Sequence, residues 1–547
     1  MDAQSEIVDV SESPSLSLTK IALEDMYEDG TVDPVYQAKA RVLNNAIQEI
    51  GMGKYQIHLF ICAGFGWFAD SVWPLITGLI LTQVTAEFSF NGPLLTLAAN
   101  IGLLVGAIVW SVGCDIWGRR WSFNLTLLIA GVFGLSAGGS PNFVTLASLL
   151  AVVGVGVGGN MPVDSAVFLD LIPGTHQYLL TVMSVWWSLG QLLCSLLAWP
   201  LIANYSCPVG ASVCERSQNM GWRYLLFTLG GITLLLWCLR FFLFTLVESP
   251  RFLVGIGKDA EAVSVIHKVA EYNSTSTGLS VEHLNEAAGQ KPGNVKRPAL
   301  SRTSVYGLEH VKALFRTRKI AISTTLLIVL WGIIGLASTL YNSFLPYLLT
   351  SRGADYGDGS LSITYRNVEC FPFRLATNSD RLAAIHSQRH WHPRSIPRRV
   401  GCRAAIHRSS RHFGYIIGRV VCFLTLLTLF NDPSRKTGLT GAFLFASTTA
   451  RSSNALLGWN CGYVFNSNIM YGVLYAVSAE IFPAKHRGTG NGMVSTATRV
   501  FGVIAPVIAL YADIATAVPV YIAGALIIFA GVLAMLLPYE PRGKASI

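Results

Sequence analysis

Hydrophobic and polar positions alternate in long blocks along the chain, with apolar segments separated by polar turns. A helix needs about 20 mostly apolar residues to cross the roughly 30 Å hydrocarbon layer of a membrane. Ten segments meet this length requirement: 57–82, 94–114, 121–140, 143–169, 178–203, 223–247, 320–349, 456–479, 489–511 and 517–537. Two weaker apolar segments, 413–430 and 437–450, lie between the seventh and eighth of these, where an eighth and a ninth helix are expected. The pattern predicts an all-α polytopic membrane protein with nominally 12 spans, ten plus the weaker two.

Composition supports a lipid environment. Of the 547 residues, 52% are hydrophobic and only 13% are charged, whereas soluble domains carry about 25% charged residues. No spacing typical of a nucleophile elbow, a phosphate-binding loop or a metal-ligand cluster occurs. We therefore expect neither an enzyme, nor a cofactor, nor a metal site.

Polar stretches divide the apolar segments into two groups. Residues 1–54 carry ten acidic against four basic residues, which is typical of a disordered tail without a cleavable signal. Lys and Arg gather in alternate connections between the segments, which predicts that both termini are cytoplasmic. The membrane is either the plasma membrane or an internal membrane. The expected domains are a cytoplasmic tail (1–54), an N-terminal six-helix bundle (55–247), a cytoplasmic linker (248–318), a C-terminal bundle (319–537) and a second cytoplasmic tail (538–547).

A short internal repeat links the two halves. An acid, a proline and a histidine recur at the same spacing after the fourth and the tenth segments, beginning at Asp170 and at Glu480. Both copies follow equivalent helices. The repeat favours two related six-helix bundles.

Residues 364–412 do not fit this plan. They hold ten arginines, no lysine and five histidines against two acids, so their net charge of +8 accounts for most of the chain's +9. The basic balance is therefore not a nucleic-acid footprint, and no nucleic-acid partner is expected. Two interpretations stay open: a basic surface loop, or a segment translated from the wrong frame or from a retained intron, extending over 364–435.

Two cysteines differ from the others, most of which lie inside apolar segments. Cys207 and Cys214 share the connection after the fifth segment, with six residues between them. That connection is expected outside the cell or in a lumen, where a disulfide between them can form.

Charged residues inside apolar segments are the strongest functional signal. A carboxylate at the bilayer centre costs about 2.5–3.5 kcal/mol on insertion scales, so Asp70 and Asp164 are candidates for proton coupling. The alternative is a permanently neutral, hydrogen-bonded carboxyl. Arg499 can pair with a solute carboxylate or with an acid of the protein, and both possibilities stay open.

Polar and aromatic residues in other segments can line a solute path, although packing and interfacial anchoring explain such residues equally well. Amides beside aromatic rings suit a sugar or a small organic acid. The candidates are Asn160, Gln191, Trp186, Tyr341, Asn342, Asn466, Asn468, Tyr471, Tyr475 and Arg499.

Charged turns at helix ends form a second group of candidates. Asp115, Gly118, Arg119 and Arg120 lie between the second and third segments, where a carboxylate and arginines can pair and latch the cytoplasmic side. The other gate candidates are Asp170, Glu248, Arg251, Glu480 and Arg487.

These motifs resemble those of the major facilitator superfamily. The turn at Asp115 resembles its G-x-x-x-D-x-x-G-R-[RK] signature, with Ser111 in place of the first glycine. The run from Glu248 resembles the sugar-porter motif E-S-P-R-[WY]-L, and the run from Glu480 resembles E-x-[FY]-P-x-x-x-R-G-x-G.

Stretches 64–70 and 156–164 narrow the resemblance to the sugar-porter-like branch related to synaptic vesicle transporter proteins, with fungal-type members. Two positions depart from that pattern. Leu150 stands where many relatives have an arginine, and Gln177 stands where the second half has Arg487.

The resemblance implies a major-facilitator fold of two six-helix bundles and a secondary active transporter. We expect a small polar or anionic solute, a sugar or an organic acid, moved by alternating access together with protons. The expected partners are that solute, protons and the bilayer, and the expected state is a monomer. The alternative is a non-transporting membrane sensor, or the inactive product of a damaged or mispredicted gene.

Overall fold

The computed structural model describes eight ranges of the chain. Every regular element within them is a helix, which confirms the all-α prediction for these residues. The described ranges are 34–207, 214–289, 311–312, 314–355, 433–448, 453–482, 487–511 and 518–537.

The N-terminal half contributes six helical passages, several of them made of two helices. The fourth is broken at Gly159, and the fifth breaks after a single turn, so the segments expected at 143–169 and 178–203 are not continuous helices. The elements are α3 (Lys54–Phe88), α4 (Pro93–Ile116), α5 (Arg119–Ala137), α6 (Phe143–Gly158), α7 (Asn160–Leu171), α8 (Leu179–Val182), α9 (Ser184–Tyr205), α10 (Gly221–Cys238) and η3 (Leu239–Leu243).

The C-terminal half has five long helices among the described residues. The weaker segment 437–450 lies largely within one of them, whereas 413–430 lies outside the described residues, as does the anomalous stretch 364–435 up to Asn431–Asp432. The helices are α15 (Arg318–Asp355), α19 (Pro433–Thr448), α20 (Ser453–Ile481), α21 (Arg487–Tyr511) and α22 (Val518–Ala534).

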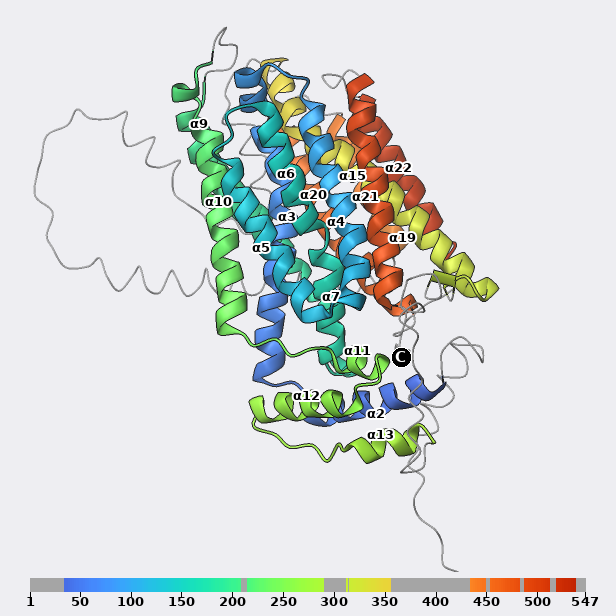
Figure 1. The fold of residues 1–547 in the computed structure, drawn as a ribbon. Helices are drawn as coiled ribbons and strands as arrows, with labels where there is room; N and C mark the ends of the chain where they lie inside the picture. The colour runs from blue at the N-terminus through green and yellow to red at the C-terminus, as the bar shows by residue number, and fades with distance from the viewer. Residues whose placement is uncertain are drawn as a thin grey trace, which may run out of the picture.

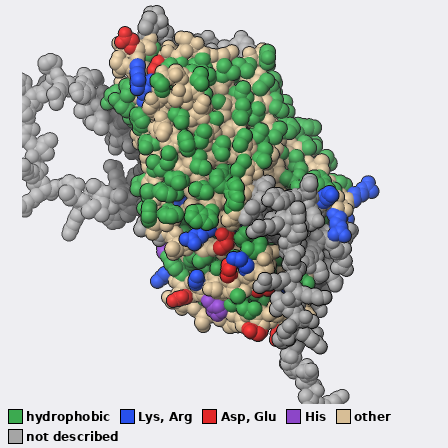
Figure 2. All heavy atoms as spheres, viewed as in Figure 1, with side chains coloured by type: hydrophobic (Ala, Val, Ile, Leu, Met, Phe, Trp, Pro, Cys, Tyr) green, Lys and Arg blue, Asp and Glu red, His purple; other side chains and the backbone are tan. Residues whose placement is uncertain are grey.

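Seven stretches of the described residues are long and apolar enough to cross a membrane, and α22 is a shorter apolar helix. Helices α5, α19 and α20 occupy predicted segments but are shorter or more polar. Hydrophobic side chains cover the middle of the visible face of the molecule, while charged side chains gather below them (Figure 2). This distribution fits a lipid-exposed belt.

The two halves repeat their helix pairings. Within the N-terminal bundle α3 packs on α9 and α5 packs on α10, and within the C-terminal bundle the equivalent α15 packs on α21 and α19 on α22. Contacts of α3 with α15 and of α4 with α21 join the bundles. The helices stand side by side along one common direction (Figure 1).

Four shorter helices form a layer across one end of the N-terminal bundle (Figure 1). We call this group the helical layer, and the bundle end beside it the layered end. Three of its members lie within the linker expected at 248–318. The helical layer consists of α2 (Pro34–Ile50), α11 (Pro250–Gly255), α12 (Asp259–Tyr272) and α13 (Val281–Ala287).

Helix α2 corrects the expectation that all of residues 1–54 are disordered. Leu43, Ile47 and Ile50 recur at helical spacing and are buried, so the segment has an apolar face despite its polar composition. Lys39 is also buried and pairs with Asp259 of α12 at 2.5 Å. Packing against the linker helices therefore folds this part of the tail.

Glycines let helices approach closely inside the N-terminal bundle. A Cβ at Gly156 of α6 would stand 2.6 Å from the backbone oxygen of Thr126 and 2.8 Å from the backbone nitrogen of Ala130 in α5. Backbone atoms cannot move aside as a flexible side chain can. Gly231 of α10, in contrast, has nothing within 4 Å of the same position.

Gly156→Ala should therefore lower the thermal unfolding midpoint, because overpacking costs about 1–3 kcal/mol against a gain in helix propensity of about 1 kcal/mol. Gly231→Ala should keep or raise the midpoint. Thermal unfolding of both purified variants checks this. Equal midpoints for the two variants would show that the α5–α6 approach is not tight.

Candidate transport site

An ion pair joins the two bundles inside the molecule. Arg499 of α21 donates from Nη2 to Oδ1 of Asp70 in α3 at 2.9 Å, across 429 positions of sequence. The Asp70 side chain is 2% exposed and that of Arg499 is 16% exposed. The sequence left two possible partners for Arg499, a solute carboxylate or an acid of the protein. In the structure its partner is an acid of the protein, Asp70.

Aromatic rings from both bundles surround this level of the molecule. Trp67, one helical turn before Asp70, lies 5.5 Å from the ring of Tyr475 in α20. Tyr475 in turn lies 4.5 Å from Trp331 of α15. On the other side, Trp187 of α9 lies 5.0 Å from Tyr471. These rings form one contact chain between the bundles, because Trp331 also contacts Tyr471.

A second ion pair is sealed inside the N-terminal bundle. Asp164 of α7 pairs with Arg240 of η3, and both side chains are 0% exposed. The Arg240 guanidinium carbon lies 3.0 Å from the ring centroid of Phe123, a cation–π contact. Gly66 of α3 makes room for the Asp164 carboxylate, since a Cβ there would collide with Oδ2. Asp164 thus lies beside α3, one turn from Asp70.

The other path candidates divide by surroundings. Asn160 is fully buried, and its amide has no partner among the described residues. Tyr475 donates to Met161 Sδ at 3.1 Å, and Tyr471 donates to Ser338 Oγ at 2.7 Å. Trp186 packs edge-on against Phe65. Tyr471 and Tyr475 therefore lie at the bundle interface. Asn160 precedes Met161, the partner of Tyr475, whereas the contact of Trp186 with Phe65 lies within the N-terminal bundle.

Some candidates serve their own helix or bundle instead. Tyr341 donates to Asn460 Oδ1 within the C-terminal bundle. Asn466 and Asn468 donate to backbone oxygens four residues earlier in α20. Asn342 is exposed and Gln191 is half-buried.

A network of charges occupies the layered end. Glu248 accepts backbone hydrogen bonds from Arg119, at 2.8 Å, and Arg120, at 3.3 Å, and so caps the first turn of α5. Gly118 has a positive φ of 93°, and a Cβ there would stand 2.7 Å from Glu248 Oε2. Only glycine fits both demands easily. The side chain of Arg120 itself is exposed.

Asp170, in the last turn of α7, gathers three partners. Its carboxylate forms ion pairs with Arg119 and, at 3.6 Å, with Arg251. It also accepts from Ser249 Oγ at 2.5 Å. Arg251 further donates to Asn44 of α2 at 2.6 Å. The network therefore ties α5, α7, α11 and the helical layer together.

Two cations lie close together in this network, and the pKa of Arg251 reflects this. Burial lowers the pKa of its guanidinium, and the neighbouring Arg119 lowers it further. Asp170 offsets this repulsion. Asp115, Glu480 and Arg487 were also predicted to join the gate. The structure describes the backbone of these three residues but not their side chains.

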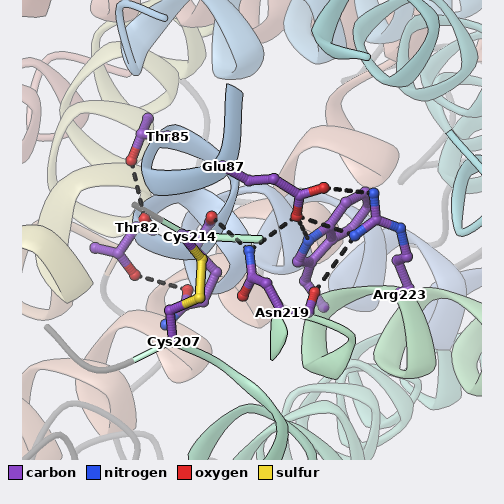
Figure 3. Close-up of a disulfide and its surroundings, with 9 residues drawn as sticks. Thr82, Thr85, Glu87, Cys207, Cys214, Asn219 and Arg223 are labelled. Carbon is purple, nitrogen blue, oxygen red and sulfur yellow. Dashed lines mark hydrogen bonds and ion pairs between the residues drawn. A yellow bond between two sulfur atoms is a disulfide. The ribbon is translucent and has the colours of Figure 1, made fainter. Parts of the chain in front are cut away.

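The opposite end carries a separate cluster (Figure 3). Cys207 and Cys214 form a disulfide there. Close by, Glu87 accepts two hydrogen bonds from Arg223, at 2.7 and 3.0 Å, and one each from Asn219 and Trp222. This cluster fastens the end of α3 to the start of α10.

Sequence reasoning missed Arg240, Arg223 and Glu87. Arg240 and Arg223 are the cations of the sixth apolar segment, and a cation in such a segment indicates a buried acid partner. No group of three or more His, Cys, Asp or Glu able to hold a metal occurs among the described residues.

Comparison with known proteins supports the motifs. The family model described as Major Facilitator Superfamily matches residues 59–365. The chain is 60% identical to "MFS siderochrome iron transporter 1" of Ceriporiopsis subvermispora, over 96% of this chain and 94% of that protein. It is 26% identical to synaptic vesicle glycoprotein 2A of Rattus norvegicus over 45% of this chain and 34% of that protein.

The fold also matches a solved structure. The proton:xylose symporter XylE of E. coli superposes with a TM-score of 0.57 at 14% identity, covering 90% of this chain and 98% of the symporter. At that identity the likeness concerns the fold alone, which is the major-facilitator fold predicted from the motifs. The family model, which matches more than half of the residues, and the relative at 60% identity show that the chain belongs to the Major Facilitator Superfamily and is a multi-pass membrane transporter.

Proposed function

We propose that the chain is a secondary active transporter that moves a small polar or anionic solute by alternating access, coupled to protons. The observation that carries the proposal is the Asp70–Arg499 pair. Among the described residues, it is the ion pair in which a carboxylate of one bundle meets a cation of the other inside the molecule. Proton uptake by Asp70 weakens this pair, since a neutral carboxyl holds a guanidinium far less tightly.

The side chains at the bundle interface indicate which class of solute can bind there. Tyr471, Tyr475 and Asn160 offer hydroxyl and amide groups beside aromatic rings, which suits a polar organic solute. The relative at 60% identity is named a siderochrome iron transporter, so an iron–siderochrome complex belongs beside sugars and organic acids among the solutes to test. A screen of these solutes in proteoliposomes, with and without a pH gradient, identifies the substrate.

Asp70→Asn should abolish uptake driven by an inward proton gradient while leaving the protein folded in the membrane. Asparagine keeps the size and a hydrogen bond to Arg499 but cannot exchange a proton. Uptake into proteoliposomes measures this, with Glu271→Gln, an exposed acid of α12, as the control that keeps wild-type uptake. Gradient-driven uptake at the wild-type rate in Asp70→Asn would rule out Asp70 as the coupling group.

Asp164 is the second proton-coupling candidate, and its surroundings favour a smaller role. Its pair with Arg240 lies wholly within the N-terminal bundle, so rocking of the bundles does not separate the two. We assign Asp164 to holding α7, α3 and η3 together. Measuring uptake in Asp164→Asn tests this: lower protein stability with normal proton coupling fits, and lost coupling does not.

The layered end is proposed to face the cytoplasm and to act as the gate there. The basic turn at Arg119 and Arg120 and the linker's Lys and Arg favour this orientation. Asp170 holds Arg119 and Arg251 at the ends of neighbouring helices. These side chains are largely buried in the structure, so the gate opens only if the ends of α5 and α7 and the helical layer move apart and let water reach the charges.

Asp170→Asn should open this gate more often. Ser338 is buried beside Tyr471, from which its hydroxyl accepts a hydrogen bond. A cysteine introduced there by Ser338→Cys, in a protein whose other free cysteines are replaced, should then react about five-fold faster or more with a maleimide added from the cytoplasmic side. A lost coupling of about 1 kcal/mol produces that shift. The control is Glu261→Gln, which breaks the exposed Lys258–Glu261 pair. Unchanged reactivity in Asp170→Asn would remove Asp170 from the gate.

A further inference from the structure

The Asp70–Arg499 pair leaves much of its hydrogen-bonding capacity unused. Arg499 has five N–H donors, and the contact to Asp70 is made through Nη2. Its Nε is buried without a partner among the described residues. The Arg499 side chain is also 16% exposed, against 0% for Arg240 in the other intramembrane pair. Arg499 therefore has both spare donors and an accessible side.

The neighbouring aromatic chain is rich in donors as well. The indole Nε1 atoms of Trp67 and Trp187 are buried without a partner among the residues described. Both rings contact tyrosines of α20, at the interface of the bundles. Trp73 is different, because its ring packs against Gly134 inside the N-terminal bundle. The unused N–H groups of Arg499, Trp67 and Trp187 are donors, which complement an oxygen-rich anion.

Charge balance gives the reason for an anion. In the structure Asp70 neutralises Arg499. If Asp70 takes up a proton while a neutral solute binds, the guanidinium is left without a counter-ion in a low-dielectric site, which is costly. If the solute brings its own oxyanion, one carboxylate replaces another and the site keeps its net charge. Within the described ranges, the other titratable groups that interact with Asp70 are Asp164 of α7 and Tyr471 and Tyr475 of α20.

We propose that the solute carries an oxyanion that binds Arg499 in place of Asp70, and that the proton taken up by Asp70 and the anion enter together. The inference rests on the proposed function and deepens it, because it narrows a polar or anionic solute to an acid. Arg499 becomes the anion-binding residue, and Trp67 and Trp187 become donors to the same solute. No covalent step is involved: Asp70 gains a proton, and Arg499 keeps its charge throughout.

The first test uses small anions as probes and needs no knowledge of the solute. Asp70→Asn removes the competing carboxylate, so acetate should raise the thermal unfolding midpoint of this variant in nanodiscs at pH 7, whereas acetamide should not. The effect should vanish in the double variant Asp70→Asn/Arg499→Gln. Acetate that leaves Asp70→Asn unchanged, or that stabilises the double variant equally, would overturn the proposal.

A matched control separates an accessible arginine from any arginine deprived of its acid. Asp164→Asn leaves Arg240 without its partner, but this pair is sealed within the N-terminal bundle. Acetate should therefore not stabilise that variant. If it does so as strongly as in Asp70→Asn, acetate binding reports unpaired cations in general, and the assignment to the bundle interface fails.

A second test keeps the proposal falsifiable if these variants do not fold. Wild-type protein in proteoliposomes is offered matched pairs of an acid and its neutral counterpart, such as gluconate and glucose or galacturonate and galactose, under an inward proton gradient. Accumulation of acids without their neutral counterparts supports the proposal. Accumulation of neutral solutes alone overturns it but leaves proton-coupled transport standing, whereas no gradient-driven accumulation of any solute in the wider screen counts against the proposed function itself.

Discussion

A carboxylate and a guanidinium buried together between two helical bundles place a strong constraint on everything around them. Neither Asp70 nor Arg499 can be left alone in a low-dielectric interior without a large penalty, so their pairing favours the arrangement in which α3 and α21 approach. Any opening of the interface at this level must supply a substitute for one partner. A proton and an anion together are such a substitute. In the proposed mechanism proton and solute are coupled because the site keeps its net charge when both enter.

The other buried pairs have a different arrangement, which explains why they suit structural roles. Arg240 with Asp164, and Arg223 with Glu87, each join elements of the N-terminal bundle alone. They hold the elements of this bundle together, as do the close approaches at its glycines. At the layered end, Asp170 ties the bundle to the helical layer through Ser249 and Arg251, and the proposed gate opens at this contact. Rigid bundles and separable contacts between them are what alternating access requires.

Much of this could be read from the sequence, and the physical reasons for the misses are specific. Asp70 and Asp164 stand out because acids in apolar segments are costly. Their partners could not be assigned, since which helices approach each other across 429 positions is a property of the packed fold. Arg240 was not predicted as a site residue, because a cation in the last third of the predicted span 223–247 can also be explained by the nearby membrane surface. Helix α2 was missed because the acidic residues of the tail outweighed the spacing of Leu43, Ile47 and Ile50, whose burial depends on linker helices more than 200 positions away.

A double-mutant cycle measures whether Asp70 and Arg499 stabilise each other across the bundle interface. The thermal stabilities of the wild type, Asp70→Asn, Arg499→Gln and the double variant would be measured in nanodiscs under one set of conditions. Residues that interact directly show coupling energies of about 0.5–3 kcal/mol. The account predicts that the double variant is more stable than the sum of the two single losses implies, by at least about 1 kcal/mol. If the stability losses of the two single variants simply add, Asp70 and Arg499 do not stabilise each other, and the pair does not hold the interface together.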